Sequence, residues 1–296
     1  MKEKPFSKYQ ILANAVMIIW TLAIILPFIL LFMSSITDEN TLVANGYSFF
    51  PKKFSLASYS YIIKSGGQIL KAYGVSIGVT VVGTLLNVLL SALMAYPLSV
   101  KNLPGRNVMM FFVFFTMLFN GGIVPSYIMW TGTFHIKDTI FAQLLPNFLL
   151  SAWNVMMIRT YFTTSIPDGL YEAAEIDGAS QFTIFWKIVL PLGKPILVTM
   201  GTFAGLAYWN DWTNGLYYIV KNTGLYNVQN LLNQIVQHIQ FLTQSSNSNV
   251  TAAASTIPAT GIQMAIAFVA ILPIMLIFPS FQKYYAKGIA LGAVKG

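Results

Sequence analysis

Cysteine is absent from this 296-residue sequence, which excludes disulfide bonds and thiolate chemistry. The sequence also lacks a GxxxxGKS/T phosphate-binding loop and an H-E-x-x-H motif, so we assign neither ATP hydrolysis nor a metalloprotease site to this chain. Its two histidines, His135 and His238, are far apart in the sequence and do not suggest a metal site. We therefore expect that the chain is not an enzyme and binds no cofactor or metal of its own.

Charged side chains are also few, at 9% of the residues, whereas hydrophobic residues make up 56%. A soluble domain of this composition would expose large apolar patches, so we predict an integral protein of the cell membrane that is surrounded by lipid. Lys and Arg number 17 against 9 Asp and Glu, but they are scattered at the ends of apolar segments and not clustered with aromatic residues. This distribution predicts no binding of nucleic acid.

Six segments contain about 20 or more mostly apolar residues, the length that crosses the hydrocarbon core of a bilayer as a helix. They predict an all-α fold in which six transmembrane helices form a bundle within one domain, residues 1–296. The predicted spans are residues 11–36, 73–98, 108–130, 139–158, 195–220 and 262–281. The first apolar segment is too long for a signal peptide and is predicted to be a retained span.

An even number of spans places both termini on the same side of the membrane. With this arrangement, 11 of the 17 Lys and Arg residues lie on the side of the termini and 6 lie on the other side. Because cytoplasmic loops carry the excess of basic residues, both termini are predicted to be cytoplasmic. The loop 159–194 is then cytoplasmic, and the loops 37–72 and 221–261 are extracytoplasmic.

The loop 159–194 contains the most informative part of the sequence. Its residues 172–191 read EAAEIDGASQFTIFWKIVLP and form a polar, glycine-interrupted segment between two apolar spans. Ser165, Pro167 and Asp168 precede it and are typical of a helix start. We predict a first helix from this point to about residue 177.

Four residues of this first helix are predicted to share one face, where small alanines allow another backbone to approach and an aspartate supplies a polar anchor. They are Leu170, Ala173, Ala174 and Asp177. Gly178 follows directly and is predicted to end the helix, because a glycine just past the last turn can adopt the left-handed conformation.

A second helix is predicted to begin near Ser180. Its apolar side is expected to comprise Phe182, Phe185 and Val189, with Ile184 and Ile188 beside them. Pro191 and Pro195 then redirect the chain into the membrane. The two helices together predict a short, rigid knob that binds a partner. The alternative is an amphipathic helix that lies on the membrane surface, but such a helix would require neither the small residues nor the interrupting glycine.

Asp211 is an acidic residue inside a predicted span, in the segment Tyr208-Trp209-Asn210-Asp211-Trp212. A carboxylate is costly in lipid, so Asp211 is expected to face the bundle interior or water. Trp209 and Trp212 suit a sugar pathway, because aromatic rings stack on sugar faces while Asn210 and Asp211 can bind hydroxyl groups. The alternative is an aromatic belt at the membrane interface, or a hydrogen bond that only joins two helices.

The EAA sequence, the glycine and the Ile-Val-Leu-Pro ending at Pro191 resemble the signature loop of ABC importer permeases. The resemblance extends over nearly the whole chain and is closest to carbohydrate-uptake permeases, in the second-permease branch that includes maltose-type and alginate-type subunits. It is carried by Asn120-Gly121-Gly122-Ile123-Val124-Pro125, Leu145-Pro146-Asn147, Arg159, the Trp-Asn-Asp of the fifth span and the tail from Gln282 to Gly296.

This resemblance implies the fold of an ABC type I importer permease and a function in transport by alternating access. It implies a heterodimer with a second related permease, two cytoplasmic ATPase subunits that bind ATP and Mg, and an extracytoplasmic solute-binding protein that delivers a sugar. The residues that match the coupling motif are Glu172, Ala173, Ala174, Asp177, Gly178 and Pro191.

Three other functions fit parts of the sequence. The same architecture could carry a non-sugar solute, because the EAA loop also occurs in importers of peptides and ions. An ion-coupled secondary transporter would require internal repeats or several ionisable groups within the membrane, which we do not find. A membrane scaffold would use the EAA loop only to bind another protein.

Overall fold

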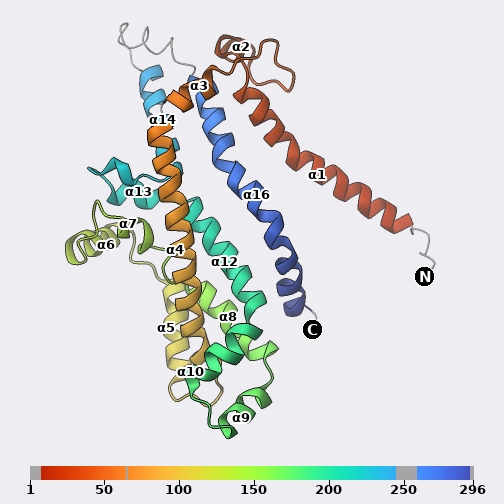
Figure 1. Ribbon diagram of the computed structural model, residues 1–296, viewed down its shortest axis with the longest axis vertical. Coiled ribbons are helices and arrows are strands. Elements are labelled where there is room, and N and C mark those ends of the chain that lie inside the picture. The colour runs from red at the N-terminus through yellow and green to blue at the C-terminus, as the bar shows by residue number, and fades with distance from the viewer. Residues whose placement is uncertain (1–7, 65, 245–258, 294–296) are drawn as a thin grey trace. The chain divides into compact units, whose positions relative to one another are not determined.

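A computed structural model of the chain describes residues 8–64, 66–244 and 259–293, and these are helical with no strand among them (Figure 1). An isolated β-bridge pairs Thr37 with Phe54. Residues 245–258 of the predicted loop 221–261 lie outside the described residues. The chain divides into two compact units: the first comprises residues 1–69 and 232–273, and the second comprises residues 70–231 and 274–296.

The first unit contains α1, which is nearly uniformly apolar and exposed along most of its length, up to the buried Ser34 and Ser35, as expected for a helix that faces lipid. Elements α3, α14 and α16 of this unit pack around a cluster formed by Ile62, Ile262 and Ile266. Its helices are α1 (Lys8–Ser35), α2 (Glu39–Asn45), α3 (Ala57–Lys64), the later part of α14 (Val228–Gln244) and the earlier part of α16 (Ala259–Ala293).

The second unit contains most of α4 and the elements between α4 and α14. They are α4 (Gly66–Ser99), α5 (Arg106–Leu118), α6 (Ile123–Ile128), the π-helix η1 (Met129–Thr133), α7 (Phe141–Leu144), α8 (Ala152–Ser165), α9 (Asp168–Ile176), α10 (Gln181–Ile184), the π-helix η2 (Phe185–Val189), α11 (Leu190–Leu192), α12 (Lys194–Trp209), α13 (Thr213–Tyr218) and the 3₁₀ helix η3 (Thr223–Leu225).

Among the described residues, three helical stretches are continuous, long and apolar enough to cross a membrane, or up to five if each of two bent helix pairs counts as one span. The continuous stretches are Tyr9–Ser35, Gly67–Ser99 and Thr260–Ile277, and they coincide with the predicted spans 11–36, 73–98 and 262–281. The number and positions of six crossings remain a prediction.

The other three predicted spans are not continuous helices. In segment 108–130 the chain bends by 110° between α5 and the following helices, where Gly122 has a φ of +87°. Segment 139–158 contains only the four-residue α7 before α8 begins, and Pro146 and the left-handed Asn147 lie in the gap. Segment 195–220 is interrupted between Trp209 and Thr213. Glycine or proline lies at the first two breaks, so local backbone chemistry interrupts helices there that hydropathy alone predicts to be continuous, whereas the third break contains neither residue.

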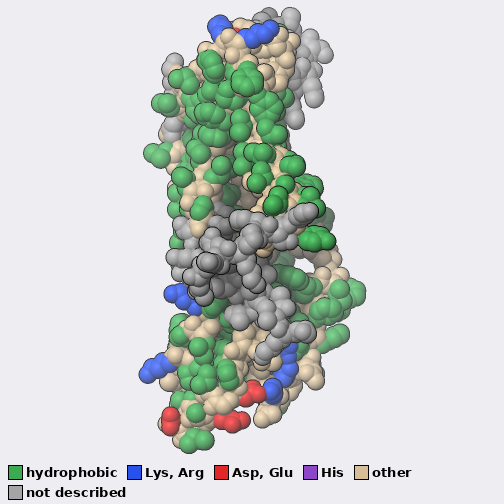
Figure 2. All heavy atoms as spheres, turned by 90° about the vertical axis from the view of Figure 1, so that its right-hand side faces the viewer, with side chains coloured by type: hydrophobic (Ala, Val, Ile, Leu, Met, Phe, Trp, Pro, Cys, Tyr) green, Lys and Arg blue, Asp and Glu red, His purple; other side chains and the backbone are tan. Residues whose placement is uncertain are grey.

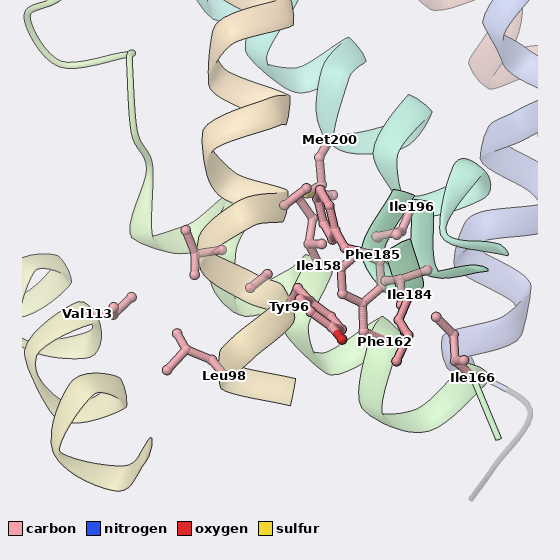
Figure 3. Close-up of a cluster of buried hydrophobic side chains, with 14 of the residues drawn as sticks. Tyr96, Leu98, Val113, Ile158, Phe162, Ile166, Ile184, Phe185, Ile196 and Met200 are labelled. Atoms are coloured by element: carbon pink, nitrogen blue, oxygen red, sulfur yellow. The ribbon is translucent and has the colours of Figure 1, made fainter. Parts of the chain in front are cut away.

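The main apolar core of the second unit lies where α4, α8, α10, η2 and α12 meet (Figure 3). Phe162, Ile158 and Ile184 are fully buried there, and burial of each such side chain contributes about 1.5–3 kcal/mol. Gly193 allows the closest approach, because a Cβ atom at this position would lie 2.5 Å from the Phe162 ring. This core supports the loop 159–194.

Candidate functional site

The first helix of the loop 159–194 is α9, and it begins at Asp168 as the sequence predicts. Asp168 forms an exposed ion pair with Lys101, which follows α4. At the start of the loop, in α8, Arg159 donates a hydrogen bond from Nε to the carbonyl of Leu98, 3.2 Å away. Burial lowers the pKa of the Arg159 guanidinium from its ordinary value, and the nearby charge of Arg106 lowers it further. These contacts hold the entry to the loop against the C-terminal end of α4.

Gly178 ends α9 with a φ of +74°, which confirms the predicted left-handed conformation. The amide of Gly178 donates to the carbonyl of Glu175 at 3.0 Å, and the amide of Ala179 donates to the carbonyl of Ala174 at 2.9 Å. This pair of hydrogen bonds is a Schellman motif, which satisfies the last carbonyls of the helix and reverses the chain. The turn between the two helices of the loop is thus fixed by backbone geometry.

The second helix begins as predicted, because the Oγ of Ser180 accepts a hydrogen bond from the amide of Thr183 at 3.3 Å. It continues through α10, η2 and α11. Pro191 was expected to redirect the chain, but the helix runs past it to Leu192 and the chain then turns by 78° at Gly193. The chain turns at Gly193 because this residue, without a side chain, leaves room for the turn against Phe162.

The four residues predicted to share one face of α9 have different surroundings. Ala174 is buried in the apolar core, whereas Leu170, Ala173 and Asp177 are exposed, and so is the neighbouring Glu172. The small residue at position 174 therefore allows α9 to pack closely on its own chain. The residues that match the coupling motif accordingly form two groups, one of which is accessible to a partner.

The second helix also differs from its prediction at one position. Phe185 and Val189 are buried as expected, but 72% of Phe182 is exposed. Ile176 at the end of α9 is 86% exposed, and Trp186 is half exposed. We call Ile176, Phe182 and Trp186 the exposed apolar residues of the loop. On the face drawn in Figure 2, Asp and Glu side chains gather at the lower end, which is the end that carries α9 in Figure 1.

The segment Trp209–Trp212 forms the interruption between α12 and α13. Asp211 is only 5% exposed, and its Oδ1 accepts hydrogen bonds from the amides of Thr213 at 3.0 Å and Asn214 at 3.2 Å. It therefore caps α13, a role that the sequence interpretation did not include. Trp209 is buried, whereas Asn210 is exposed and Trp212 is 44% exposed.

Buried amide side chains surround this interruption, and we call them, together with Asp211, the polar node. Its further members are Gln143, Asn214, Asn227 and Asn230. Asn227 Nδ2 donates to the carbonyl of Asp211 at 2.6 Å, and Asn230 donates to the carbonyl of Trp212. The node thus supplies donors to two carbonyl groups at the break in the helix, where backbone groups within a membrane need partners.

The polar node also joins segments that are distant in the sequence. Gln143 Nε2 donates to Asn230 Oδ1 at 3.2 Å, and Asn214 Nδ2 donates to the carbonyl of Pro146, also at 3.2 Å. Gly215 makes room for the node, since a Cβ atom there would lie 1.9 Å from Asn230 Oδ1. The four amides of the node were not predicted from the sequence to be functional. The only sign of the node in the sequence was the presence of polar residues beside Pro146 and Asp211.

Catalytic and metal-binding arrangements are not found in the described part of the chain. Residues 74–78 match the G-x-S-x-G spacing, but Ser76 lies within α4 and its hydroxyl accepts a hydrogen bond from the amide of Val228 at 2.9 Å. A nucleophilic serine of that motif requires a strand-turn-helix instead. No group of three or more His, Cys, Asp or Glu residues converges among the described residues.

Comparison with known proteins identifies the family of the chain. Residues 74–291 match the family model of the binding-protein-dependent transport system inner membrane component. The chain belongs to this family. Members are transport components and not enzymes, and they are integral to the membrane. The match covers the loop 159–194, the polar node and most of α16.

Two curated relatives of this transport family come from Bacillus subtilis strain 168. Protein LplC is 36% identical over 92% of this chain and 90% of its own length. The polygalacturonan/rhamnogalacturonan transport system permease protein YtcP is 36% identical over 97% of this chain and 98% of its own length. Among solved structures, a chain of a bacterial ABC transporter that imports the acidic polysaccharide alginate is similar, with a TM-score of 0.79 and 26% identity over 96% of this chain and all of that chain. The all-α fold of an ABC importer permease is therefore shown.

Proposed function

We propose that the chain is a permease subunit of an ATP-driven ABC importer and forms part of the translocation pathway for an oligosaccharide or polysaccharide. The observation that carries this proposal is the rigid, exposed knob in the loop 159–194, set in a fold that matches an alginate importer over nearly its whole length. The sugar specificity is supported by the relatives that transport polygalacturonan and rhamnogalacturonan. We call the loop 159–194 the coupling loop from here on.

The coupling loop is proposed to bind a cytoplasmic ATPase. Large apolar side chains exposed outside the predicted spans are costly unless a partner covers them, and Ile176 and Phe182 are of this kind. The exposed Glu172 and Asp177 add polar contacts beside them. The ATPase subunits would bind ATP and Mg and supply all of the chemistry, while Gly178 and Ala174 hold the loop in shape.

The complete transporter is proposed to contain this chain, a second related permease, two ATPase subunits and an extracytoplasmic solute-binding protein. Both termini and the coupling loop would then lie in the cytoplasm, in agreement with the distribution of Lys and Arg. The loops 37–72 and 221–261 would face the binding protein. Closure of the ATPase pair would move the coupling loop, and the attached helices would open the pathway alternately to each side.

The substrate pathway is proposed to include the segment Trp209–Trp212. Of these residues, Asn210 and Trp212 are exposed and can contact a sugar, whereas Trp209 and Asp211 are buried and would hold the interruption in place. The Trp209 ring packs beside the ring of Tyr73, with 6.3 Å between centroids. Asp211 is thus assigned a positioning role through its cap on α13.

Purification of the tagged chain from its native membrane tests the proposal. We expect a second permease and an ATPase to co-purify, and the ATPase activity to rise on addition of a sugar-loaded binding protein. Recovery of the chain without an ATPase would refute the importer function and favour an ion-coupled transporter. An ATPase that responds only to a non-sugar ligand would retain the importer and refute the sugar specificity.

A further inference from the structure

A chain of side-chain hydrogen bonds connects both helices of the coupling loop to the C-terminal end of α4. The hydroxyl of Tyr96, which is buried near the end of α4, donates to Oε1 of Gln181, the first residue of α10. Gln181 Nε2 in turn donates to Oε1 of Glu175 in α9, at 3.0 Å. One amide group therefore joins three elements, and we call these three residues the amide link.

Aromatic packing fixes the position of the amide link. The Tyr96 ring is stacked with the Tyr171 ring of α9 at 6.4 Å between centroids, and it lies 5.4 Å from the Phe185 ring of η2. Figure 3 shows Tyr96 beside Phe185 within the apolar core. A hydrogen bond formed by a buried, well-packed hydroxyl is stronger and more directional than one exposed to water. The orientation of the Tyr96 hydroxyl is thus set by its neighbours.

The chemistry of residue 181 must be that of an amide. The link requires an acceptor that faces the Tyr96 hydroxyl and a donor that faces the Glu175 carboxylate, and a glutamine supplies both. A glutamate at position 181 would place a second negative charge beside Glu175, and a methionine would supply neither group. The Tyr96 end of the link is buried, whereas the hydrogen bond between Gln181 and Glu175 is exposed. The ion pair between Lys101 and Asp168 is also exposed, and such pairs contribute little.

We propose that Gln181 and Tyr96 are positioning residues that transmit displacement of the coupling loop to α4, the helix of the second predicted span. The proposal rests on the proposed function, because it assumes that an ATPase moves the loop. The Schellman turn at Gly178 makes α9 and α10 move together, and the amide link makes α4 follow them. Without the link, the loop still binds the ATPase but moves α4 less, so more ATP is hydrolysed for each sugar transported.

The experiment compares variants of the complete transporter in proteoliposomes, with sugar uptake and ATP hydrolysis measured in the same sample. For Tyr96→Phe we expect ATP hydrolysis within about twofold of the wild type and about a threefold to tenfold rise in ATP consumed per sugar, as loss of one hydrogen bond predicts. Gln181→Met should give a similar ratio. The double variant should be no worse than the more affected single variant, because both substitutions remove the same link.

Tyr161→Phe is the matched control, because the Tyr161 ring packs against the same core from α8 but Tyr161 is not part of the amide link. Its ratio of ATP to sugar should equal that of the wild type. An unchanged ratio for Tyr96→Phe, or a proportional loss of uptake and hydrolysis together, would overturn the amide link as a transmitting element. A wild-type complex without sugar-stimulated ATP hydrolysis would instead refute the proposed function itself.

Discussion

Gly178 and Asp138 both adopt left-handed backbone conformations, but for different physical reasons. Gly178, with a φ of +74°, has no Cβ atom and adopts this conformation without steric cost. Asp138, with a φ of +58°, is held by its own carboxylate, whose Oδ1 accepts hydrogen bonds from the amides of Val220 and Lys221 at 2.7 Å and of Asn222 at 3.2 Å. At the residue scale, the left-handed conformation of Gly178 depends on the absence of a side chain, whereas that of Asp138 depends on the charge of its side chain.

Substitution of Gly178 should strain the turn of the coupling loop without a steric clash. A Cβ atom there would meet no atom within 4 Å, so the cost of Gly178→Ala comes from the left-handed backbone alone and is about 1–2 kcal/mol. We expect reduced sugar-stimulated ATPase activity with normal membrane insertion. Gly178→Asn should be milder, because asparagine tolerates this conformation. Equal activities for the alanine variant and the wild type would contradict the role of the turn.

Asp138 should make stability depend on pH. The amide of Lys221, followed by those of Val220 and Asn222, holds the pKa of the Asp138 carboxyl below its ordinary value in the folded state. Its contribution is therefore present above the unfolded pKa, about 3.9, and is lost as the pH falls through the folded pKa. Asp138→Ala should lower the melting temperature of the purified protein at pH 7, and the difference from wild type should shrink below about pH 4. A difference independent of pH would refute this origin.

Broken helices are the main feature at the element scale, and they explain how far sequence could predict the fold. Hydropathy identified the apolar segments and three continuous helices, because length and composition are properties of one stretch of chain. The break at Asp211 is instead held by tertiary contacts of the polar node, such as that between Gln143 and Asn230, which are 87 residues apart in the sequence. Such contacts leave no local pattern. The interruption at Asp211 was therefore interpreted as one helix with a polar residue inside it.

In the coupling loop, too, locally determined features could be predicted from the sequence and tertiary contacts could not. The turn at Gly178 and the cap at Ser180 were predicted correctly, because both follow from the local chemistry of a few neighbouring residues. The burial of Ala174 and the exposure of Phe182 were not, because each depends on where α4 and α8 lie against the loop. Helical spacing alone could not decide which side of each helix faces the apolar core of the second unit.

Glycines on α4 test how closely this helix packs. A Cβ atom at Gly83 would lie 2.5 Å from the Tyr208 ring, whereas one at Gly74 would meet nothing within 4 Å. Gly83→Ala should therefore displace α12 and destabilise the protein by about 1–3 kcal/mol, as overpacked cores do. Gly74→Ala on the same helix is the control and should be neutral or slightly stabilising. Thermal unfolding in detergent would measure both, and equal melting temperatures would contradict the observed packing.

At the scale of the whole molecule, two apolar surfaces are exposed, and different kinds of partner can cover them. α1 is exposed along most of its length and lies in a predicted span, so lipid or the second permease can cover it. The exposed apolar residues of the coupling loop lie outside the predicted spans and need a protein partner. At least one soluble subunit is therefore expected to bind the second unit at the coupling loop.

Polar substitutions should separate binding of the ATPase from folding of the permease. Ile176→Ser and Phe182→Ser change exposed side chains, so they should leave the amount of membrane-inserted chain unchanged while reducing the ATPase that co-purifies. Phe185→Ser is the contrasting variant, since Phe185 is buried and its loss should lower the yield of folded protein. Full recovery of the ATPase with both exposed variants would show that it binds elsewhere.

The central claim is that this chain conducts sugar at the expense of ATP hydrolysed by partner subunits. It is tested most directly by uptake of radiolabelled oligosaccharides, neutral and acidic, into proteoliposomes that contain the purified complex and enclosed ATP. The account predicts uptake that requires both ATP and the loaded binding protein and that falls in the Gly178→Ala variant. Uptake that proceeds without ATP, or responds only to an imposed ion gradient, would contradict it.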